Sequence, residues 1–208
     1  MDLSGVPPMA FVVTGIIAIT GINIVNRLAV NSIKTRWGVI AANYVIALTL
    51  SLLIFAANGY HAASAFTIGL AVVSGMLYIG GMYLGMTTIG RRGASIAVSA
   101  SQLSVLIPVS LSVLIYGDSL STTQLIGVGV ALVSLPLLAA KSTGLNGALD
   151  RGTFALIVIQ LVVQGFAQFT SKVLVATGLG GERDAFFVVV FAAATLMTIP
   201  VASGTGER

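Results

Sequence analysis

The sequence contains no cysteine and very little charge. The absence of cysteine among 208 residues excludes disulfides, thiolate metal sites and cysteine nucleophiles. Ten Lys or Arg and six Asp or Glu make up 8% of the chain, against roughly 25% in soluble domains. So few charges cannot cover a globule of this size, which would expose large apolar patches to water. A soluble enzyme, a nucleic-acid binder and a disordered chain are therefore excluded.

Long apolar runs take the place of the missing charge. Apolar residues form 57% of the chain, and the mean hydropathy is +1.05. A membrane-spanning helix needs about 20 mostly apolar residues, and charge-free runs of that length recur. We expect an all-α, polytopic membrane helix bundle in the cell (inner or plasma) membrane, with the lipid bilayer as its main partner. The seven predicted helices cover residues 8–26, 37–57, 66–89, 93–116, 122–140, 153–171 and 185–201.

The positive charges are unevenly divided between the two sides of this predicted bundle. The connections after the first, third, fifth and seventh helices carry eight of the ten basic residues, and the other side has Lys172 and Arg183. The positive-inside rule then predicts the N-terminus outside the cytoplasm. Because the basic residues form no tract or stripe, the net charge of +4 gives no nucleic-acid signature.

Two boundaries have recognisable local chemistry. Ser121 and Gln124 fit a capping box before an apolar run, which predicts a helix beginning there. Asp118 then lies in a tight turn, where we expect a solvated acid that favours the helix N-terminus, with a functional role as the alternative. Pro108 removes the hydrogen bond to the carbonyl of Ser104, so the fourth helix should kink, either to shape packing or to offer that carbonyl to a substrate.

The ends of the first and sixth predicted helices resemble each other at an offset of 145 residues. Five helices separate them, and five is odd, so the sixth helix should run opposite to the first. This pattern is typical of the inverted repeats of secondary transporters, and chance similarity between two helix ends is the alternative. The matched positions are Asn23, Asn26 and Arg27 in the first segment and Gln168, Ser171 and Lys172 in the second.

A longer stretch resembles a known family. The sequence GASIAVSASQLSVLIPV at 93–109, followed by YGDSLS at 116–121 and QLIG at 124–127, has a small-residue opening, a mid-helix proline, a glycine-acid turn and a Q-x-x-G start, in that order. It is similar to the fourth and fifth helices of EamA-like members of the drug/metabolite transporter superfamily. Asp118 stands where that family usually has Glu.

The resemblance implies a fold and an activity. The family fold has ten helices in two inverted five-helix repeats, so the seven expected helices correspond to 5+2 of a 5+5 arrangement, and we expect the chain to be truncated. Residues 1–145 would form the first repeat and 146–208 the first two helices of the second. The implied function is secondary transport or export of a small polar or amphipathic metabolite by alternating access. The alternative is a non-transporting membrane fragment or an interaction subunit, and pairing of two copies as a homodimer stays open.

Polar residues within the apolar runs are the candidate ligands, because buried polar groups are costly in lipid. Gln160, Gln164, Gln168 and Lys172 recur every four residues along one helix face. They line either an anion-tolerant cavity or a set of interhelical hydrogen bonds, with Lys172 reaching the interface. The predicted substrate-binding residues are Asn23, Asn43, Tyr78, Ser99, Gln102, Gln164 and Gln168.

Small residues predict close helix packing. Gly81 and Gly85, four apart in the third predicted helix, and Gly127 in the fifth indicate faces on which neighbouring backbones approach.

Several functional groups are missing from the predicted spans. No Asp or Glu lies within any of them, and the single histidine, His61, falls in a predicted loop. Neither a nucleophile with its base nor a set of metal ligands can be assembled, so we expect no enzyme activity, no metal and no cofactor.

Overall fold

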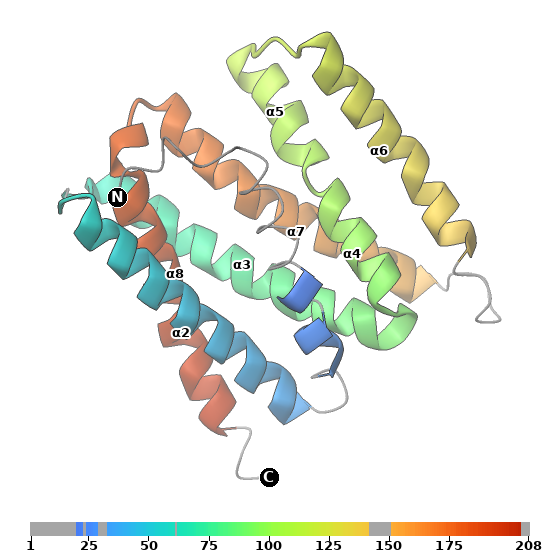
Figure 1. The fold of residues 1–208 in the computed structure, drawn as a ribbon, viewed down its shortest axis with the longest axis horizontal. Coiled ribbons are helices and arrows are strands. Elements are labelled where there is room, and N and C mark those ends of the chain that lie inside the picture. The colour runs from blue at the N-terminus through green and yellow to red at the C-terminus, as the bar shows by residue number, and fades with distance from the viewer. Residues whose placement is uncertain (1–19, 23, 29–32, 61, 142–150, 205–208) are drawn as a thin grey trace.

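The described part of the chain is a bundle of helices (Figure 1). Successive helices alternate in direction, with α4 and α5 running the same way as two parts of one interrupted helix. The computed structural model describes residues 20–22, 24–28, 33–60, 62–141 and 151–204. Most of the predicted first helix lies outside the described residues. Residues 20–22 and 24–28, near its predicted end, are described and are helical. The elements that follow are α2 (Ile33–Ala57), α3 (Ala65–Arg92), α4 (Ala94–Leu103), α5 (Leu106–Tyr116), α6 (Thr122–Lys141), α7 (Arg151–Ala176), the 3-10 turn η2 (Gly180–Glu182) and α8 (Arg183–Gly204).

Five stretches of the described chain are long and apolar enough to cross a membrane. Four of them belong to single long helices or a helix with its preceding turn, and the fifth combines α4 and α5. This is the makeup of a multi-pass membrane protein, as the charge-free runs predict. The five spans are Arg36–Ala57, Ala65–Arg92, Ala94–Tyr116, Arg151–Ala176 and Gly180–Gly204.

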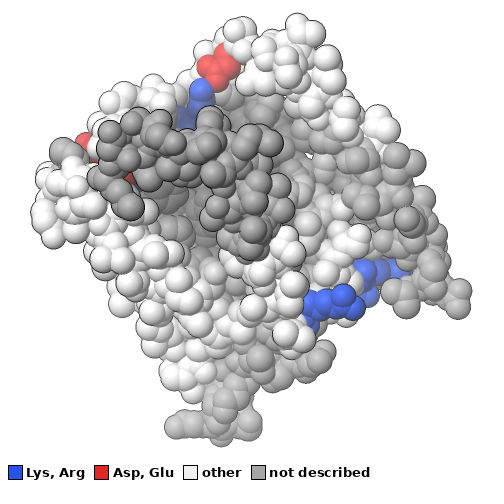
Figure 2. Space-filling view, in the orientation of Figure 1, with Lys and Arg blue, Asp and Glu red and all other residues white. Residues whose placement is uncertain are grey.

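The outer surface fits contact with lipid. Large apolar side chains point outward along the helices, among them Leu114, 79% exposed, and Leu196, 73% exposed. Figure 2 shows charged side chains near the ends of the visible face, with a wide uncharged surface between them. An apolar belt flanked by charge is the surface that a bilayer stabilises.

The fourth predicted span is interrupted at the predicted place. α4 ends at Leu103, five residues before Pro108, and α5 begins at Leu106, two residues before it. The carbonyl of Ser104, which proline deprives of its usual donor, instead accepts the Ile107 N–H at 3.1 Å. The kink is therefore confirmed, and the freed carbonyl is satisfied within the chain.

α7 lies against α3 on one side and against α4 and α5 on the other (Figure 1). α7 runs antiparallel to α3. Gly81 of α3 approaches Gln164 of α7, and Gly85, one turn later on α3, approaches Gln160, one turn earlier on α7. The predicted close-packing face at Gly81 and Gly85 is confirmed. The one predicted at Gly127 is wrong: a Cβ there would meet nothing within 4 Å, since that position of α6 faces open space.

α2 and α8 lie side by side and run in opposite directions (Figure 1). The buried side chains of this part include Ile40 and Tyr44 from α2 and Ala194 from α8, packed with Met86 of α3 in one apolar cluster. A second cluster joins Ala71 of α3 to Leu174 of α7 and to Phe186 and Val190 of α8. α3, α7 and α8 therefore share one continuous packed interior.

The closest helix contact yields a first prediction. A Cβ on Gly165 of α7 would lie 2.6 Å from the Ile107 side chain and 2.8 Å from the carbonyl oxygen of Ser104. Gly165→Ala should therefore lower the free energy of unfolding by about 1–3 kcal/mol, because α5 must move away. Unfolding of the purified protein by SDS titration in mixed micelles measures the change.

Gly69→Ala is the matched control, since Gly69 is also within a helix and a Cβ there meets nothing within 4 Å. It should be neutral or stabilising by up to about 1 kcal/mol. Equal effects of the two substitutions would contradict the packing described for α5 on α7.

Candidate binding cavity

A cavity of about 520 Å³ opens among the helices. Helical residues 22 and 26, α2, α3, α4, α7 and α8 all contribute to its wall, so it is built from both ends of the chain. Its volume is in the usual range for small-molecule sites. The lining residues are Ile22, Asn26, Asn43, Tyr44, Ala47, Leu77, Tyr78, Gly81, Met82, Gly85, Met86, Ile89, Ala97, Val98, Ser101, Gln102, Gln164, Ala167, Gln168 and Phe191.

One side of the cavity carries amides that are held by serines of α4 and of the break that follows it. The Oε1 atom of Gln164 accepts a hydrogen bond from Ser101 Oγ at 3.3 Å. The Nε2 atom of Gln168 donates to Ser104 Oγ at 2.7 Å. Each amide thus uses one end on a neighbouring helix and keeps the other end for the cavity. The Gln164 amide retains its donors and the Gln168 amide retains its acceptor.

Gln160, one turn earlier on α7, is bonded at both ends and is fully buried. Its Nε2 donates to the carbonyl of Ala97 at 3.1 Å and to Ser101 Oγ at 3.0 Å, while its Oε1 accepts from Thr88 Oγ1 at 2.6 Å. It therefore joins α3, α4 and α7 and does not line the cavity. Of the two roles predicted for this row, Gln160 has the structural one, whereas Gln164 and Gln168 combine both.

Three aromatic rings form another part of the wall. The Phe191 ring of α8 lies 6.4 Å from the Tyr44 ring of α2 and 6.4 Å from the Tyr78 ring of α3, centroid to centroid. All three residues line the cavity. Rings in this arrangement offer flat apolar surface with hydroxyl groups at its edge.

Two asparagines add polar groups that are weakly bonded. Asn43 of α2 donates to the sulfur of Met82 at 3.7 Å, and a thioether is a weak acceptor. The Oδ1 atom of Asn26 is buried and has no hydrogen-bond partner in the part of the chain that the structure describes. A buried acceptor without a donor is costly, so a bound solute or water would relieve it.

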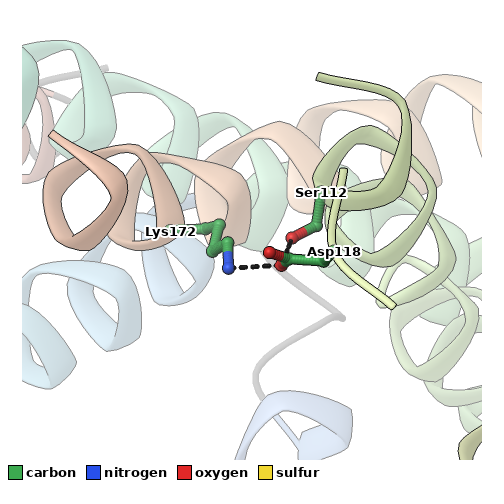
Figure 3. Close-up of polar contacts among 3 residues, drawn as sticks. All are labelled: Ser112, Asp118 and Lys172. Carbon is green, nitrogen blue, oxygen red and sulfur yellow. Dashed lines mark hydrogen bonds and ion pairs between the residues drawn. The ribbon is translucent and has the colours of Figure 1, made fainter. Parts of the chain in front are cut away.

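Lys172 does not line the cavity, which corrects the prediction of an anion-tolerant site. Its Nζ atom lies 2.5 Å from Asp118 Oδ2, and that carboxylate also accepts a hydrogen bond from Ser112 Oγ (Figure 3). Lys172 also lies over the Tyr116 ring, 5.9 Å from its centroid. The ammonium is therefore neutralised by α5 and its turn, one helical turn beyond Gln168.

Asp118 lies in a turn with its side chain 41% exposed, as expected, but it is also paired with a residue of another helix. Gly117 takes a left-handed conformation, φ 68°, that ends α5 and turns the chain back. This turn brings the Asp118 carboxylate to Ser112 and Lys172, with which it bonds. The hydrogen bond from Lys172, followed by that from Ser112, holds the pKa of Asp118 below its ordinary value of 3.8. The capping box after this turn is confirmed: Ser121 N–H donates to Gln124 Oε1 at 2.8 Å, and Gln124 N–H to Ser121 Oγ at 3.3 Å.

The structure brings five of the seven predicted site residues together. Ser99 is not in the lining; its Oγ donates to the carbonyl of Ser95 on its own helix. Asn23 lies outside the described residues. The five that line the cavity are Asn43, Tyr78, Gln102, Gln164 and Gln168.

The serine that faces the cavity was missed. Ser101 belongs to a stripe of small residues with Ala94, Ala97 and Ser104, and such a stripe marks the face that packs closely on a neighbour. That signal would have favoured Ser101 over Ser99. Phe191 was also missed, and nothing in its local sequence separates it from lipid-facing aromatics.

Comparisons of the chain with protein-family models, with curated proteins and with solved structures each found no match. Among the described residues, no group of three or more His, Cys, Asp or Glu side chains comes together to hold a metal ion. The described lining offers amides, hydroxyls and aromatic rings, which bind a solute through hydrogen bonds and apolar contact.

The different roles of the α7 amides predict different effects on stability. Gln160→Leu should lower the free energy of unfolding by about 1–3 kcal/mol, because buried groups of α3 and α4 lose their partner. Gln168→Leu should cost less, because it removes a single hydrogen bond and the Ser104 hydroxyl keeps its bond to the Ser101 carbonyl. SDS titration of both variants measures the difference, and a larger loss for Gln168→Leu would contradict these assignments.

The pairing of Asp118 predicts the response to acid. A carboxyl whose pKa is lowered by folding stabilises the protein above its ordinary pKa, here 3.8, and this contribution is lost as the pH falls through the lower folded-state pKa. The melting temperature of the wild-type protein should therefore fall in this acid range, and Asp118→Asn should show a shallower fall. Thermal unfolding in detergent between about pH 2 and pH 6 covers the window.

Ser119→Ala, in the same turn, is the control and should keep the wild-type profile. Parallel acid profiles for Asp118→Asn and the wild type would show that the ion pair with Lys172 does not stabilise the folded state.

Proposed function

We propose that the chain forms part of a secondary transporter of the EamA-like drug/metabolite type, which moves a small polar or amphipathic metabolite across the cell membrane by alternating access. The observation that carries the proposal is the cavity of about 520 Å³ within a bundle of apolar, membrane-length helices. Polar groups placed inside a membrane bundle are costly and typically mark a solute pathway.

The two proposed repeats share this cavity. Asn26, Asn43 and Gln102 belong to the first repeat, and Gln164 and Gln168 to the second. In inverted-repeat transporters the substrate site lies at the interface of the repeats, near the middle of the membrane. A site that draws on both repeats supports that model.

The directions of the helices also support inversion. The two matching segments, which end near Arg27 and Lys172, lead into α2 and α8. These two helices lie against each other in opposite directions, as equivalent helices of two inverted repeats would (Figure 1).

The test is transport by the purified protein in proteoliposomes, with a mixture of labelled metabolites as the solute pool. Gln164→Leu and Gln102→Leu should each lower the uptake rate about three- to tenfold, the effect of one lost hydrogen bond. Thermal unfolding should remain near that of the wild type, because both residues face the cavity.

Thr49→Val is the control. It removes a polar group from an exposed position of α2, where Thr49 bonds the Val45 carbonyl of its own helix. Uptake that is absent in the wild type, or unchanged in both cavity variants, would favour the alternative of a non-transporting membrane subunit.

A further inference from the structure

The lining of the cavity has a property that the proposed transport function does not require: it contains no charge. Among its described residues there is no Asp, Glu, Lys, Arg or His, although eight of them carry polar side chains: Asn26, Asn43, Tyr44, Tyr78, Ser101, Gln102, Gln164 and Gln168.

The nearest ammonium is also compensated. Lys172 lies one turn beyond Gln168 on the same face of α7, and it is paired with Asp118 at 2.5 Å. The pKa of Asp118 is lowered, so the carboxylate is ionised at neutral pH and the pair carries no net charge. Within the described ranges, therefore, no unpaired cation faces a solute next to Gln168.

A charged solute would lose its hydration in this cavity and gain no opposite charge in return. Transfer of an unpaired charge into apolar surroundings is far more costly than transfer of a neutral polar group whose hydrogen bonds are replaced. The lining offers a neutral polar solute both hydrogen-bond donors and hydrogen-bond acceptors in place of water. Gln164 presents N–H donors, while Gln168 and Asn26 present carbonyl acceptors.

The rings of Tyr44, Tyr78 and Phe191 complete the chemistry. They come from α2, α3 and α8, whereas the serine-held amides come from α7. A solute that fills the cavity thus meets the serine-held amides of α7 and the flat apolar surface of these rings. Planar groups stack well against such rings.

We infer that the cavity binds an uncharged, amphipathic solute with both hydrogen-bond donors and acceptors and a planar apolar part, and that it discriminates against solutes of either charge. This inference rests on the proposed function for its biological meaning, but it concerns binding and can be tested without transport.

The experiment uses probes that differ in charge at nearly constant shape. One set is N-acetylphenylalaninamide (neutral), N-acetylphenylalanine (anionic) and phenylalaninamide (cationic). A second set is adenosine with its 5′-carboxylate and 5′-amino analogues. Ligand-dependent stabilisation of the purified full chain in nanodiscs measures affinity, since any solute that binds the folded state raises the melting temperature. The neutral member should bind roughly tenfold or more tightly than either charged member of its set.

A charge placed in the cavity should then reverse this preference. Gln164→Glu keeps an acceptor for Ser101 and adds a carboxylate to the lining, so the cationic members should become the tighter ligands. Asn43→Asp, from α2, is a second variant should the first fail to fold. Gln124→Glu is the matched control, because Glu also satisfies the capping box and this position is outside the lining.

Three results would overturn the inference: a charged member that binds the wild type as tightly as its neutral counterpart, no binding by either neutral member, or no shift towards cations in the cavity variants. Neutral probes that bind but are not transported would leave the inference standing while the proposed function fails. Transport of a charged solute, with no binding of the neutral probes, would overturn the inference and support the proposed transport function.

Discussion

The structure depends on one constraint: the polar row of α7 must be satisfied inside an apolar bundle. Gln160, Gln164, Gln168 and Lys172 recur every four residues, and each meets a partner on the α4–α5 segment or its turn. α7 runs parallel to that segment, so successive turns of one helix face successive turns of the other. Because unpaired polar groups in lipid are costly, these bonds fix the register of α7 on its neighbour.

The same row explains why a cavity persists beside a tightly packed interface. Gln160 fills its site and bonds at both ends, next to the close contact with Gly85 of α3. Gln164 and Gln168 bond to α4 and the break after it at one end, and the other end meets the lining asparagines and tyrosines across an open volume. One periodic pattern thus serves two purposes. The amide that is bonded at both ends only joins helices, and the amides that are bonded at one end also line the cavity.

Local signals predicted much of this architecture, and pairings between distant residues were the part they missed. The capping box of Ser121 and Gln124 and the break before Pro108 depend on neighbours in sequence, and both are confirmed. These signals place Asp118 in a turn but do not predict its ion pair, because its partner lies 54 residues away on α7. Periodicity placed Gln164 and Gln168 on one helix face, but only the neighbouring helix determines which residue of α4 meets that face.

The contacts along α7 differ in what their separation would cost. Gln160 is fully buried and its α4 partner Ala97 is 2% exposed, so moving α4 away would leave the amide donor and the Ala97 carbonyl without water. At the other end, the side chains of Lys172 and Asp118 are 34% and 41% exposed, so water can hydrate both charges if the pair opens. The helix break at Ser104 and Val105 lies between these two regions. α4 is therefore held by bonds that water cannot replace, whereas α5 is joined at its outer end by a pair that can exchange with solvent. Separation of the α4–α5 segment from α7 consequently costs least at the outer end of α5.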